Sequence, residues 1–419
     1  MPVEIGSHYD VVIVGAGHGG TQTAIALRQG GFSGSIAIVG DELELPYERP
    51  PLSKEYFAGQ RDAARIRIRP EAFWADKDIA LLLGHRVARV DPAGREVWAS
   101  VGGRIGYGKL VWATGGRPRP LPCHNSGAEN LLYIRTLADA DRLKALAETA
   151  QRVVIIGGGY IGLEAAAVLR KAGKSVVLLE MLDRVLARAA GEEMARFVEA
   201  EHRRHGVDLR LGTRVEALEG GDRITGIRLA GGERIPCDFV VAGIGIIPAV
   251  EELAEAGAAT GNGVLVDDRC RTTLGDIYAI GDCAAHRNAH AELAIIRLES
   301  VQNASDMATV VARDIMGQGQ PYAAIPWFWS NQYDLRIQTI GLSIDHDDTI
   351  IRGDMASGSF AVIYIRSGRI VALDCVNATR DYVQGKALIL AGMHVASDLD
   401  RERLADASLP LKSLLAIEA

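Results

Sequence analysis

The sequence predicts an α/β protein with two Rossmann-like dinucleotide-binding domains, followed by an α+β C-terminal domain. Two glycine-rich loops lie far apart in the chain, and each is preceded by a short apolar run, so they predict the two nucleotide-binding domains. Short strands with alternating apolar residues, such as residues 360–365, begin after about residue 326 and predict the third domain.

The two loops share the pattern Gly-x-Gly-x-x-Gly. The first follows residues 11–14 and contains Gly15, Gly17, Gly19 and Gly20, and the second follows residues 153–156 and contains Gly157, Gly159 and Gly162. Such glycines let the backbone approach a pyrophosphate, and the helix that follows directs its N-terminus toward the anion. One loop alone is a weak signal, because short glycine clusters are common in turns. Two loops predict two bound dinucleotides and therefore electron transfer between them.

In the first half of the chain, a helix over residues 21–29 and a strand over residues 36–41 complete a βαβ unit. Residues 109–116 form another strand that ends in glycine. The proline-rich residues 117–122 predict an extended connector, because prolines at this density are incompatible with a helix. We expect the chain to leave the first domain there.

The second unit continues from the strand at residue 153 through a helix over residues 161–172 to a strand over residues 175–180. Residues 239–248 add a further strand and a breaker, and residues 277–282 predict a strand that returns to the first domain. The predicted domains are residues 1–117 together with 249–325, residues 118–248, and residues 326–419.

Composition limits the class of protein. At 419 residues the chain exceeds what one hydrophobic core usually serves. The net charge of −7 argues against nucleic acid as a partner. No apolar run approaches the roughly 18–20 residues of a membrane span, and residues 1–10 lack the apolar segment of a signal peptide. A cytoplasmic protein is expected.

The cysteines argue against metal and thiol chemistry. The five of them are widely spaced, with no Cys-x-x-Cys pair: Cys123, Cys237, Cys270, Cys283 and Cys375. This spacing offers no metal site, no iron–sulfur cluster site and no redox-active pair. We expect no metal, and thiols that are buried or incidental.

Acidic residues at the strand ends indicate which nucleotide each loop holds. Glu180 ends the second strand of the second unit, where a carboxylate accepts hydrogen bonds from an adenosine ribose and repels the extra phosphate of NADP. The sequence therefore favours NADH. Arg184 and Arg188 are an opposing signal, because arginines can bind a 2′-phosphate. In the first unit the corresponding acid is Asp41, which lies further past its strand.

Five segments carry a family resemblance. They are residues 49–54 (Arg-Pro-Pro-Leu-Ser-Lys), 112–119 (Trp-Ala-Thr-Gly-Gly-Arg-Pro-Arg), 157–164 (Gly-Gly-Gly-Tyr-Ile-Gly-Leu-Glu), 278–283 (Tyr-Ala-Ile-Gly-Asp-Cys) and 326–330 (Pro-Trp-Phe-Trp-Ser). In this order, over essentially the whole chain, they resemble the NADH-dependent, FAD-containing ferredoxin reductases of bacterial oxygenase systems, of the putidaredoxin reductase and biphenyl dioxygenase reductase type. The resemblance implies a glutathione-reductase-like fold with a split FAD domain, an inserted NADH domain and a C-terminal domain that covers the flavin.

The resemblance also implies contacts to both cofactors. Asp41 would lie near the FAD ribose, Val87 would contact adenine, and Arg135 would neutralise phosphate charge. The implied FAD contacts are Gly15, Gly17, Gly19, Gly20, Asp41, Arg49, Lys54, Val87, Ala113, Thr114, Gly115, Arg135, Gly281, Asp282, Glu299, Ser300, Val301 and Trp329. The implied NAD contacts are Gly157, Gly159, Tyr160, Ile161, Gly162, Glu180, Arg188, Gly243, Ile244 and Gly245.

Lys54 and Glu164 are the predicted catalytic pair. The resemblance places Lys54 beside the flavin, where a cation stabilises the anionic reduced form, and pairs it with Glu164 near the nicotinamide. The alternatives are a solvated lysine and a solvated helix glutamate. Trp329 would lie near the isoalloxazine, and its alternative is a core aromatic residue.

The chemistry expected is that of a flavin without a protein redox group. Residues 41–59 contain no cysteine, so thiol-dependent reductases and peroxidases of this fold are disfavoured. NADH would deliver a hydride to the flavin, which would release electrons one at a time. No conventional acid or base is required.

The one-electron acceptor must be a separate protein, because the chain has no cluster site. In the family it is an acidic two-iron two-sulfur ferredoxin that feeds a haem monooxygenase or a ring-hydroxylating dioxygenase. Alternation of Arg65, Arg67 and Arg69 would place three cations on one face of an extended strand. Further candidate docking charges are Arg61, Arg287, Arg297 and Arg313. A solvated basic edge is the alternative for the stretch, and rubredoxin, a small-molecule acceptor or a binding role are the alternatives for the function.

Overall fold

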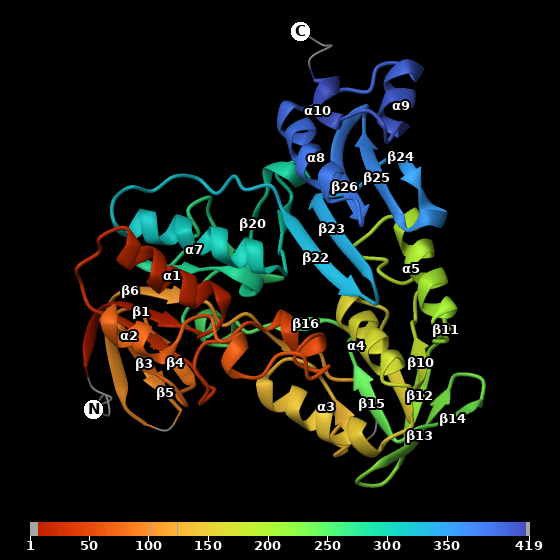
Figure 1. The fold of residues 1–419 in the computed structure, drawn as a ribbon. Coiled ribbons are helices and arrows are strands. Elements are labelled where there is room, and N and C mark those ends of the chain that lie inside the picture. Colours follow the sequence, from red (N-terminus) through yellow and green to blue (C-terminus); the bar gives the residue numbers. More distant parts are fainter. Residues whose placement is uncertain (1–6, 101, 124, 416–419) are drawn as a thin grey trace. The chain divides into compact units, whose positions relative to one another are not determined.

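The structure is a computed structural model that describes residues 7–100, 102–123 and 125–415. The chain forms two compact units (Figure 1). The first comprises Met1–Arg49, Asp62–Arg117 and Ile247–Pro326, and the second comprises Pro50–Arg61, Pro118–Ile246 and Trp327–Ala419. The predicted subdivision of the second unit at residues 118–248 and 326–419 stays a prediction.

The first unit is built on a sheet in the order β3-β2-β1-β6-β5-β4, with β19 paired to β6. Its strands are β1 (His8–Val14), β2 (Ile36–Val39), β3 (Ile79–Leu82), β4 (Val87–Asp91), β5 (Glu96–Ala99), β6 (Arg104–Trp112) and β19 (Ile277–Ala279). Residues 11–14 of β1 and all of β2 are apolar and buried, as expected for strands in a sheet that is covered on both faces. The pairing of β19 with β6 confirms that residues 277–282 return to the first sheet.

The register of this sheet brings three strand ends to one edge. Val14 of β1 pairs with Trp112 of β6, and Trp112 pairs with Ala279 of β19. The loops that begin at residues 15, 113 and 280 therefore leave the sheet together, at the edge where parallel α/β sheets bind ligands.

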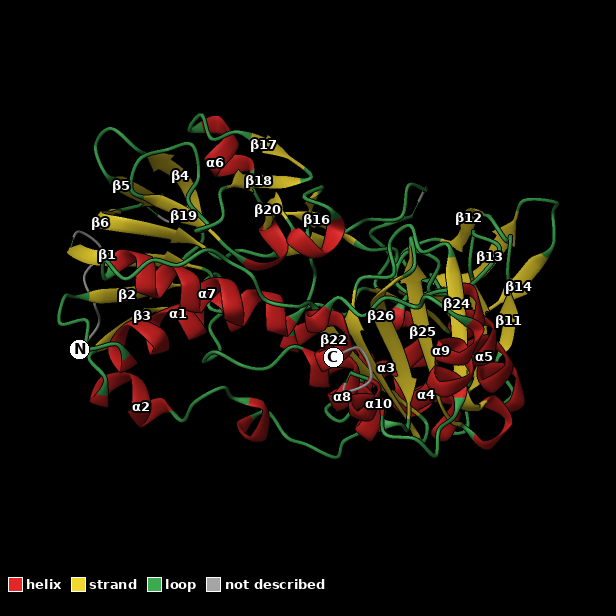
Figure 2. Cartoon of the chain, turned by 90° about the horizontal axis from the view of Figure 1, so that it is seen from above, coloured by secondary structure: helices red, strands yellow, loops and turns green. Residues whose placement is uncertain are grey.

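Helices and a small second sheet complete the first unit. Helix α1 packs along α7, and Figure 2 shows the two helices side by side next to the strands of the main sheet. The helices are α1 (His18–Gln29), α2 (Glu71–Asp76), α6 (Glu251–Glu255) and α7 (Val301–Ile315), and the small sheet contains β17 (Thr260–Gly261), β18 (Gly263–Val266), β20 (Ala284–Arg287) and β21 (Ile295–Ile296). Helix α1 begins three residues before the predicted start, because Gly17 is its N-cap.

The second unit contains a parallel sheet in the order β11-β10-β9-β15-β8. Its strands are β8 (Leu131–Leu132), β9 (Arg152–Ile156), β10 (Ser175–Leu179), β11 (Asp208–Arg210) and β15 (Phe239–Ala242), and its helices are α3 (Leu137–Thr149), α4 (Tyr160–Lys171) and α5 (Glu192–Arg204). A three-stranded antiparallel sheet of β12 (Val215–Gly220), β13 (Ile224–Leu229) and β14 (Arg234–Pro236) adjoins it in sequence. Two short strands, β7 (Gly116–Pro118) and β16 (Ile246–Pro248), lie where the chain passes between units.

The C-terminal part of the second unit is an antiparallel sheet in the order β22-β23-β26-β25-β24. The elements are β22 (Trp327–Gln332), β23 (Leu335–Gly341), β24 (Asp348–Asp354), β25 (Ser359–Arg366), β26 (Arg369–Val376), α8 (Thr379–Ala391), α9 (Asp398–Ala405) and α10 (Leu411–Leu414). Strand β25 was expected to alternate between buried and exposed residues, and this was wrong, because residues 360–365 are all buried. Its Phe360 packs on Phe197 of α5, so the face that was expected to be solvated is covered.

No helix among the described residues is long and apolar enough to cross a membrane. The expectation that residues 1–10 are not a signal peptide falls mostly on residues 1–6, which lie outside the described residues.

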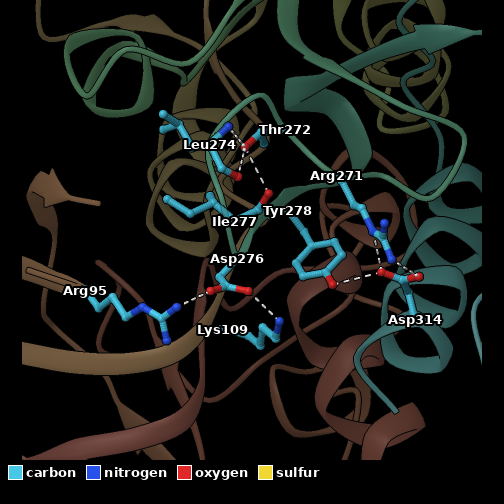
Figure 3. A network of polar contacts seen from close by, with 9 residues as sticks. All are labelled: Arg95, Lys109, Arg271, Thr272, Leu274, Asp276, Ile277, Tyr278 and Asp314. Atoms are coloured by element: carbon cyan, nitrogen blue, oxygen red, sulfur yellow. Dashed lines mark hydrogen bonds and ion pairs between the residues drawn. The ribbon is translucent and has the colours of Figure 1, made fainter. Parts of the chain in front are cut away.

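Two carboxylates anchor β19 in the first unit (Figure 3). Asp276, just before the strand, accepts hydrogen bonds from Arg95 and from Lys109, the latter at 2.5 Å. Asp314 of α7 accepts two hydrogen bonds from Arg271 at 2.7 and 2.8 Å and one from the Tyr278 hydroxyl at 2.9 Å. Burial raises the pKa of Asp314, but the hydrogen bonds from Arg271 and Tyr278 outweigh burial and hold that pKa below 3.8.

We expect Asp314→Ala to lower the free energy of unfolding by about 1–3 kcal/mol at neutral pH, because the buried Tyr278 hydroxyl loses its acceptor. Because the pKa of Asp314 is lower in the folded state than in the unfolded state, its carboxylate stabilises the folded state above the unfolded-state pKa, and this contribution is lost as the pH falls through the folded-state pKa. Chemical denaturation at neutral and acidic pH measures both effects. The difference in unfolding free energy between Asp314→Ala and the wild type should become smaller in acid. A difference that stays constant with pH would contradict the lowered pKa of Asp314.

Candidate functional site

The first glycine loop follows β1 and is packed against the residue that follows β6. Gly15 has φ of +113°, and a Cβ atom there would lie 2.2 Å from the Ala113 carbonyl oxygen. A Cβ atom on Gly20 would lie 1.9 Å from the Gly15 carbonyl oxygen. Glycine is therefore required at both positions by the protein's own backbone.

The second loop repeats this arrangement in the second unit. Gly157 has φ of +109°, and a Cβ atom there would lie 2.3 Å from the Gly243 carbonyl oxygen, which follows β15. A Cβ atom on Gly162 would lie 2.2 Å from the Gly157 carbonyl oxygen. The predicted contact segments at residues 113–115 and 243–245 thus hold equivalent positions beside the two loops.

The middle glycine of each loop is different, because the protein leaves space beside it. A Cβ atom on Gly159 would meet no described atom within 4 Å, and one on Gly17 would meet only the Arg49 Nε atom, at 4.0 Å. Gly17 and Gly159 are the N-caps of α1 and α4, and as glycines they have no side chain that could cap the helix. Each loop therefore places a helix N-terminus that its own N-cap residue does not cap beside an open space, which fits the pyrophosphate of a dinucleotide.

Arg49 is held beside the first loop by a small polar cluster. Its guanidinium donates to Glu42 at 2.7 Å and to the Tyr47 hydroxyl at 3.1 Å, and Tyr47 donates to Glu42 at 2.6 Å. A guanidinium fixed next to Gly17 is suited to phosphate charge. Asp41, the predicted ribose partner, is exposed just after β2.

Other predicted FAD residues lie on the same edge of the first unit. Gly281 and Asp282 form a 3-10 turn directly after β19, and this turn packs against α7. Ser300 caps α7 by accepting a hydrogen bond from the Asn303 amide, and Val301 is the first residue of that helix. Thr114 donates to the Ala249 carbonyl at 2.7 Å.

Three predicted FAD residues are placed differently. Val87 is buried in β4 among the core residues of the first unit. Glu299 is exposed and paired with Arg297 at 2.8 Å. Arg135 belongs to the second unit, just before α3. Their roles in FAD binding stay predictions.

Glu180 stands at the end of β10, as predicted, and its carboxylate faces the second loop. It accepts hydrogen bonds from the Gly158 amide at 2.6 Å and from the Leu182 amide at 2.8 Å. Arg184, which was an opposing signal, donates to the carbonyl oxygens of Ala190 and Ala187 and so supports the backbone. Arg188 is exposed. A negative charge therefore sits where the adenosine ribose of NAD would be bound.

The helix that follows the second loop carries Tyr160 and Ile161. The Tyr160 ring packs against Phe328 of β22, with 4.6 Å between the ring centroids. Burial raises the pKa of the Tyr160 phenol, so the hydroxyl remains protonated at neutral pH. Ile161 is exposed at the start of α4, beside the open space of the loop.

Lys54 and Glu164 form a buried ion pair in the second unit, 3.0 Å apart. Glu164 also accepts hydrogen bonds from Ser53 and Ser330, both at 2.6 Å. Trp329 lies against the pair, with the Lys54 Nζ atom 5.9 Å from its ring centroid. The side chains of Lys54, Glu164 and the two serines are all hydrogen-bonded, which offsets the cost of burying a charged pair.

Sequence reasoning anticipated the Lys54–Glu164 pair but missed its two serines. Ser53 and Ser330 both stand inside the segments that carried the resemblance, next to Lys54 and Trp329. Because serine can donate a hydrogen bond to a buried charge, the position of each serine next to a predicted site residue could have indicated its role. The placement of the pair beside a flavin stays a prediction.

The cysteines are all free, and four are buried. Burial raises the pKa of Cys237 to about 11 and the pKa of Cys375 well above its ordinary value, so these thiols are unreactive at neutral pH. One group of possible metal ligands exists among the described residues, Glu201, His205 and Asp334. Glu201 in this group is neutralised by a bidentate contact with Arg204, which makes it a poor cation site.

The fold and the two open glycine loops define a protein that binds two dinucleotides. Residues 9–308 match the family described as pyridine nucleotide-disulphide oxidoreductase, and residues 327–415 match the family described as reductase C-terminal. The chain therefore belongs to the pyridine nucleotide-disulphide oxidoreductases, and the fold class predicted from the sequence is confirmed.

Relatives specify the branch of the family. The chain is 54% identical over 413 residues to the 5,5'-dehydrodivanillate O-demethylase ferredoxin reductase subunit of Sphingobium sp. (98% of this chain, 99% of the relative). It is 56% identical over 411 residues to a ferredoxin–NAD(P)(+) reductase of Sphingomonas sp. (98% of each). The solved covalent putidaredoxin reductase–putidaredoxin complex matches with a TM-score of 0.93 at 39% identity (97% of this chain, 98% of that chain). The chain is a ferredoxin reductase by family, and the predicted resemblance is confirmed.

Glu180 should make NADH the better substrate by at least about tenfold in kcat/KM, roughly 1.4 kcal/mol, because its charge repels a 2′-phosphate. Glu180→Gln removes only the negative charge, since the glutamine side chain still accepts a hydrogen bond from the Gly158 amide. Glu180→Gln combined with Met181→Arg should move the preference toward NADPH, and Met181→Arg alone is the control. Steady-state kinetics with both nucleotides measures this, and equal use of NADH and NADPH by the wild type would exclude the role.

Proposed function

We propose that this protein oxidises NADH through bound FAD and passes the electrons singly to a two-iron two-sulfur ferredoxin that feeds a haem monooxygenase or a ring-hydroxylating dioxygenase. In balance, one NADH and two oxidised ferredoxins give NAD⁺, two reduced ferredoxins and one proton. The observation that carries the proposal is the pair of open glycine cradles on a chain whose relatives are ferredoxin reductases.

When bound, FAD supplies the conversion of a two-electron hydride donor into two one-electron transfers. We assign FAD to the loop at Gly15–Gly20 and NADH to the loop at Gly157–Gly162. The uncapped N-termini of α1 and α4 would bind the two pyrophosphates, with Arg49 adding charge at the first and Glu180 holding a ribose at the second.

Lys54 and Glu164 have the properties that the proposal needs. A lysine held by a hydrogen bond to a buried carboxylate is fixed in position, so its ammonium can stabilise negative charge on a reduced flavin. Glu164 fixes the ammonium and is itself fixed by Ser53 and Ser330. These side chains position charge and need not exchange protons during the reaction.

Thiol chemistry is not part of the proposal. Residues 41–59 contain no cysteine, and burial raises the pKa values of the thiols. Electrons must therefore leave to an external acceptor.

A rubredoxin or a small molecule is the second candidate acceptor. A binding role without electron transfer is the third candidate function. Because NADH is the donor, we expect the protein to work in the cytoplasm.

The basic stretch proposed for docking has a different shape from the one predicted. The extended strand expected at Arg65, Arg67 and Arg69 was wrong, because residues 64–66 form a 3-10 turn. The three arginines are nevertheless exposed, and Arg287 and Arg313 are exposed elsewhere in the first unit. We retain the stretch at residues 65–69 as the first candidate surface for an acidic ferredoxin.

Anaerobic stopped-flow reduction by NADH, followed by turnover with purified ferredoxin, tests the function directly. The rate of ferredoxin turnover should fall as ionic strength rises, because dissolved ions screen the electrostatic attraction between the two proteins. At physiological ionic strength this screening acts beyond about 8 Å. Arg65→Glu with Arg67→Glu should raise the apparent KM for ferredoxin about tenfold and leave NADH-to-flavin reduction unchanged.

Ferricyanide, a small acceptor, is the control, and its reduction should respond less to the double substitution. Unaltered ferredoxin turnover would move docking to another surface, with the exposed Arg287 and Arg313 tested next. The prediction of Arg297 as a docking charge was wrong, because its side chain is only 8% exposed and is paired with Glu299. Turnover with rubredoxin but not with any ferredoxin would instead support the second candidate acceptor.

A further inference from the structure

A continuous chain of buried hydrogen bonds extends from the Lys54–Glu164 pair to helix α5 in the second unit. Glu164 contacts the Ser330 hydroxyl at 2.6 Å, and Ser330 contacts the Gln332 amide nitrogen at 3.2 Å. The Gln332 amide oxygen lies 2.8 Å from the His202 Nε2 atom, and the His202 Nδ1 atom lies 3.1 Å from the Tyr333 hydroxyl. His202, Gln332 and Ser330 are fully buried.

Counting protons fixes the direction of every bond in this chain. An ionised Glu164 can only accept, so the Ser330 hydroxyl donates to it, and the Ser330 oxygen is then free to accept from the Gln332 amide nitrogen. The Gln332 amide oxygen can only accept, so His202 must carry its proton on Nε2. The Nδ1 atom of His202 then accepts from the Tyr333 hydroxyl. All donors point toward Glu164.

The far end of the chain is built to hold His202 in this state. Burial lowers the pKa of His202 to about 4, so the imidazole is neutral at pH 7, with Glu201 and His205 as its nearest titratable neighbours on α5. Burial raises the pKa of Tyr333, so its hydroxyl stays a donor. Tyr333 has φ of +56° and is stacked on His205, with 3.6 Å between ring centroids. A bulky residue in this backbone region is strained, and the stack and hydrogen bond hold it there.

We propose that His202 is a positioning residue for the Lys54–Glu164 pair, acting through Gln332 and Ser330. If His202 carried its proton on Nδ1, the Gln332 amide would have to turn, its oxygen would face Ser330, and the serine proton would be drawn away from Glu164. The chain therefore keeps a donor on the buried carboxylate. The Gln332 amide cannot pass a proton on, so this series of hydrogen bonds orients the side chains and does not conduct protons. This role rests on the proposed function of Lys54 and Glu164.

The tautomer is tested first, without reference to activity. In ¹⁵N-histidine-labelled protein, His202 should show a protonated Nε2 and an unprotonated Nδ1 at neutral pH, with its signals assigned by their loss in His202→Gln. Tyr333→Phe, which removes only a hydroxyl, should give a mixture of the two tautomers. A protonated Nδ1 in the wild type would overturn the proposal.

The effect on the pair is tested by stopped-flow reduction with NADH in FAD-loaded protein. His202→Leu and Gln332→Leu should each slow the limiting rate about tenfold, with the dissociation constant for NADH changed less than about threefold, because the Ser330 hydroxyl is then no longer oriented as a donor to the buried Glu164. His202→Gln keeps a donor and an acceptor and should recover most of the rate. The flavin potential should become more negative in the leucine variants and not in His202→Gln.

Asn130→Leu is the control for destabilisation, because Asn130 is fully buried in the same unit and its amide bonds only the backbone of residues 224 and 238. It should lower stability without changing the rate or the potential. Equal rates in His202→Leu and His202→Gln would overturn the positioning role. If NADH fails to reduce the wild type, the proposed function fails, while the tautomer measurement still decides whether the chain is directed toward Glu164.

Discussion

The close approach of each glycine loop to the carbonyl oxygen after a neighbouring strand is the constraint on which both nucleotide sites depend. The backbone of Gly15 lies so close to the Ala113 carbonyl oxygen, and that of Gly157 so close to the Gly243 carbonyl oxygen, that neither position has room for a Cβ atom. Strand register sets these approaches, because β1 with β6 and β9 with β15 end side by side. Helices α1 and α4 then begin beside open space, so the anion binding proposed for them would follow from sheet geometry.

Buried charge is the second organising feature. The buried side chains of Lys54 and Glu164 are each hydrogen-bonded in the second unit, and the residues of this cluster come from three separate parts of the chain. Ser330, Gln332 and His202 extend this cluster to α5. The first unit uses the same device at Asp276 and Asp314, where carboxylates paired with basic groups hold β19 and thereby the turn at Gly281 and Asp282.

Sequence reasoning succeeded where a local pattern has one physical cause. The two glycine loops, the strand end at Glu180 and the return of residues 277–282 follow from backbone requirements that are visible in short segments. The pairing of Lys54 with Glu164 came from family resemblance, since nothing local joins residues so far apart. The chain through Gln332 and His202 was not predictable, because an amide and an imidazole on separate elements meet only after folding. The prediction of a strand at Arg65–Arg69 was wrong because charge alternation alone does not specify backbone conformation. The prediction of alternating burial in β25 was wrong because α5 covers the face that was expected to be exposed.

The most direct test of the account separates the two loops by substitution at their open glycines. Gly17 and Gly159 have ordinary negative φ values, and a Cβ atom at either position would meet no described protein atom closer than 4.0 Å, so a valine there should obstruct the nucleotide more than the fold. Gly17→Val should purify without flavin. Gly159→Val should retain FAD, identified as the dinucleotide after denaturation, yet be reduced by NADH only at much higher nucleotide concentrations than the wild type in anaerobic stopped-flow. FAD loss from both variants, release of FMN, or unimpaired reduction of Gly159→Val by NADH would contradict the assignment of one dinucleotide to each loop.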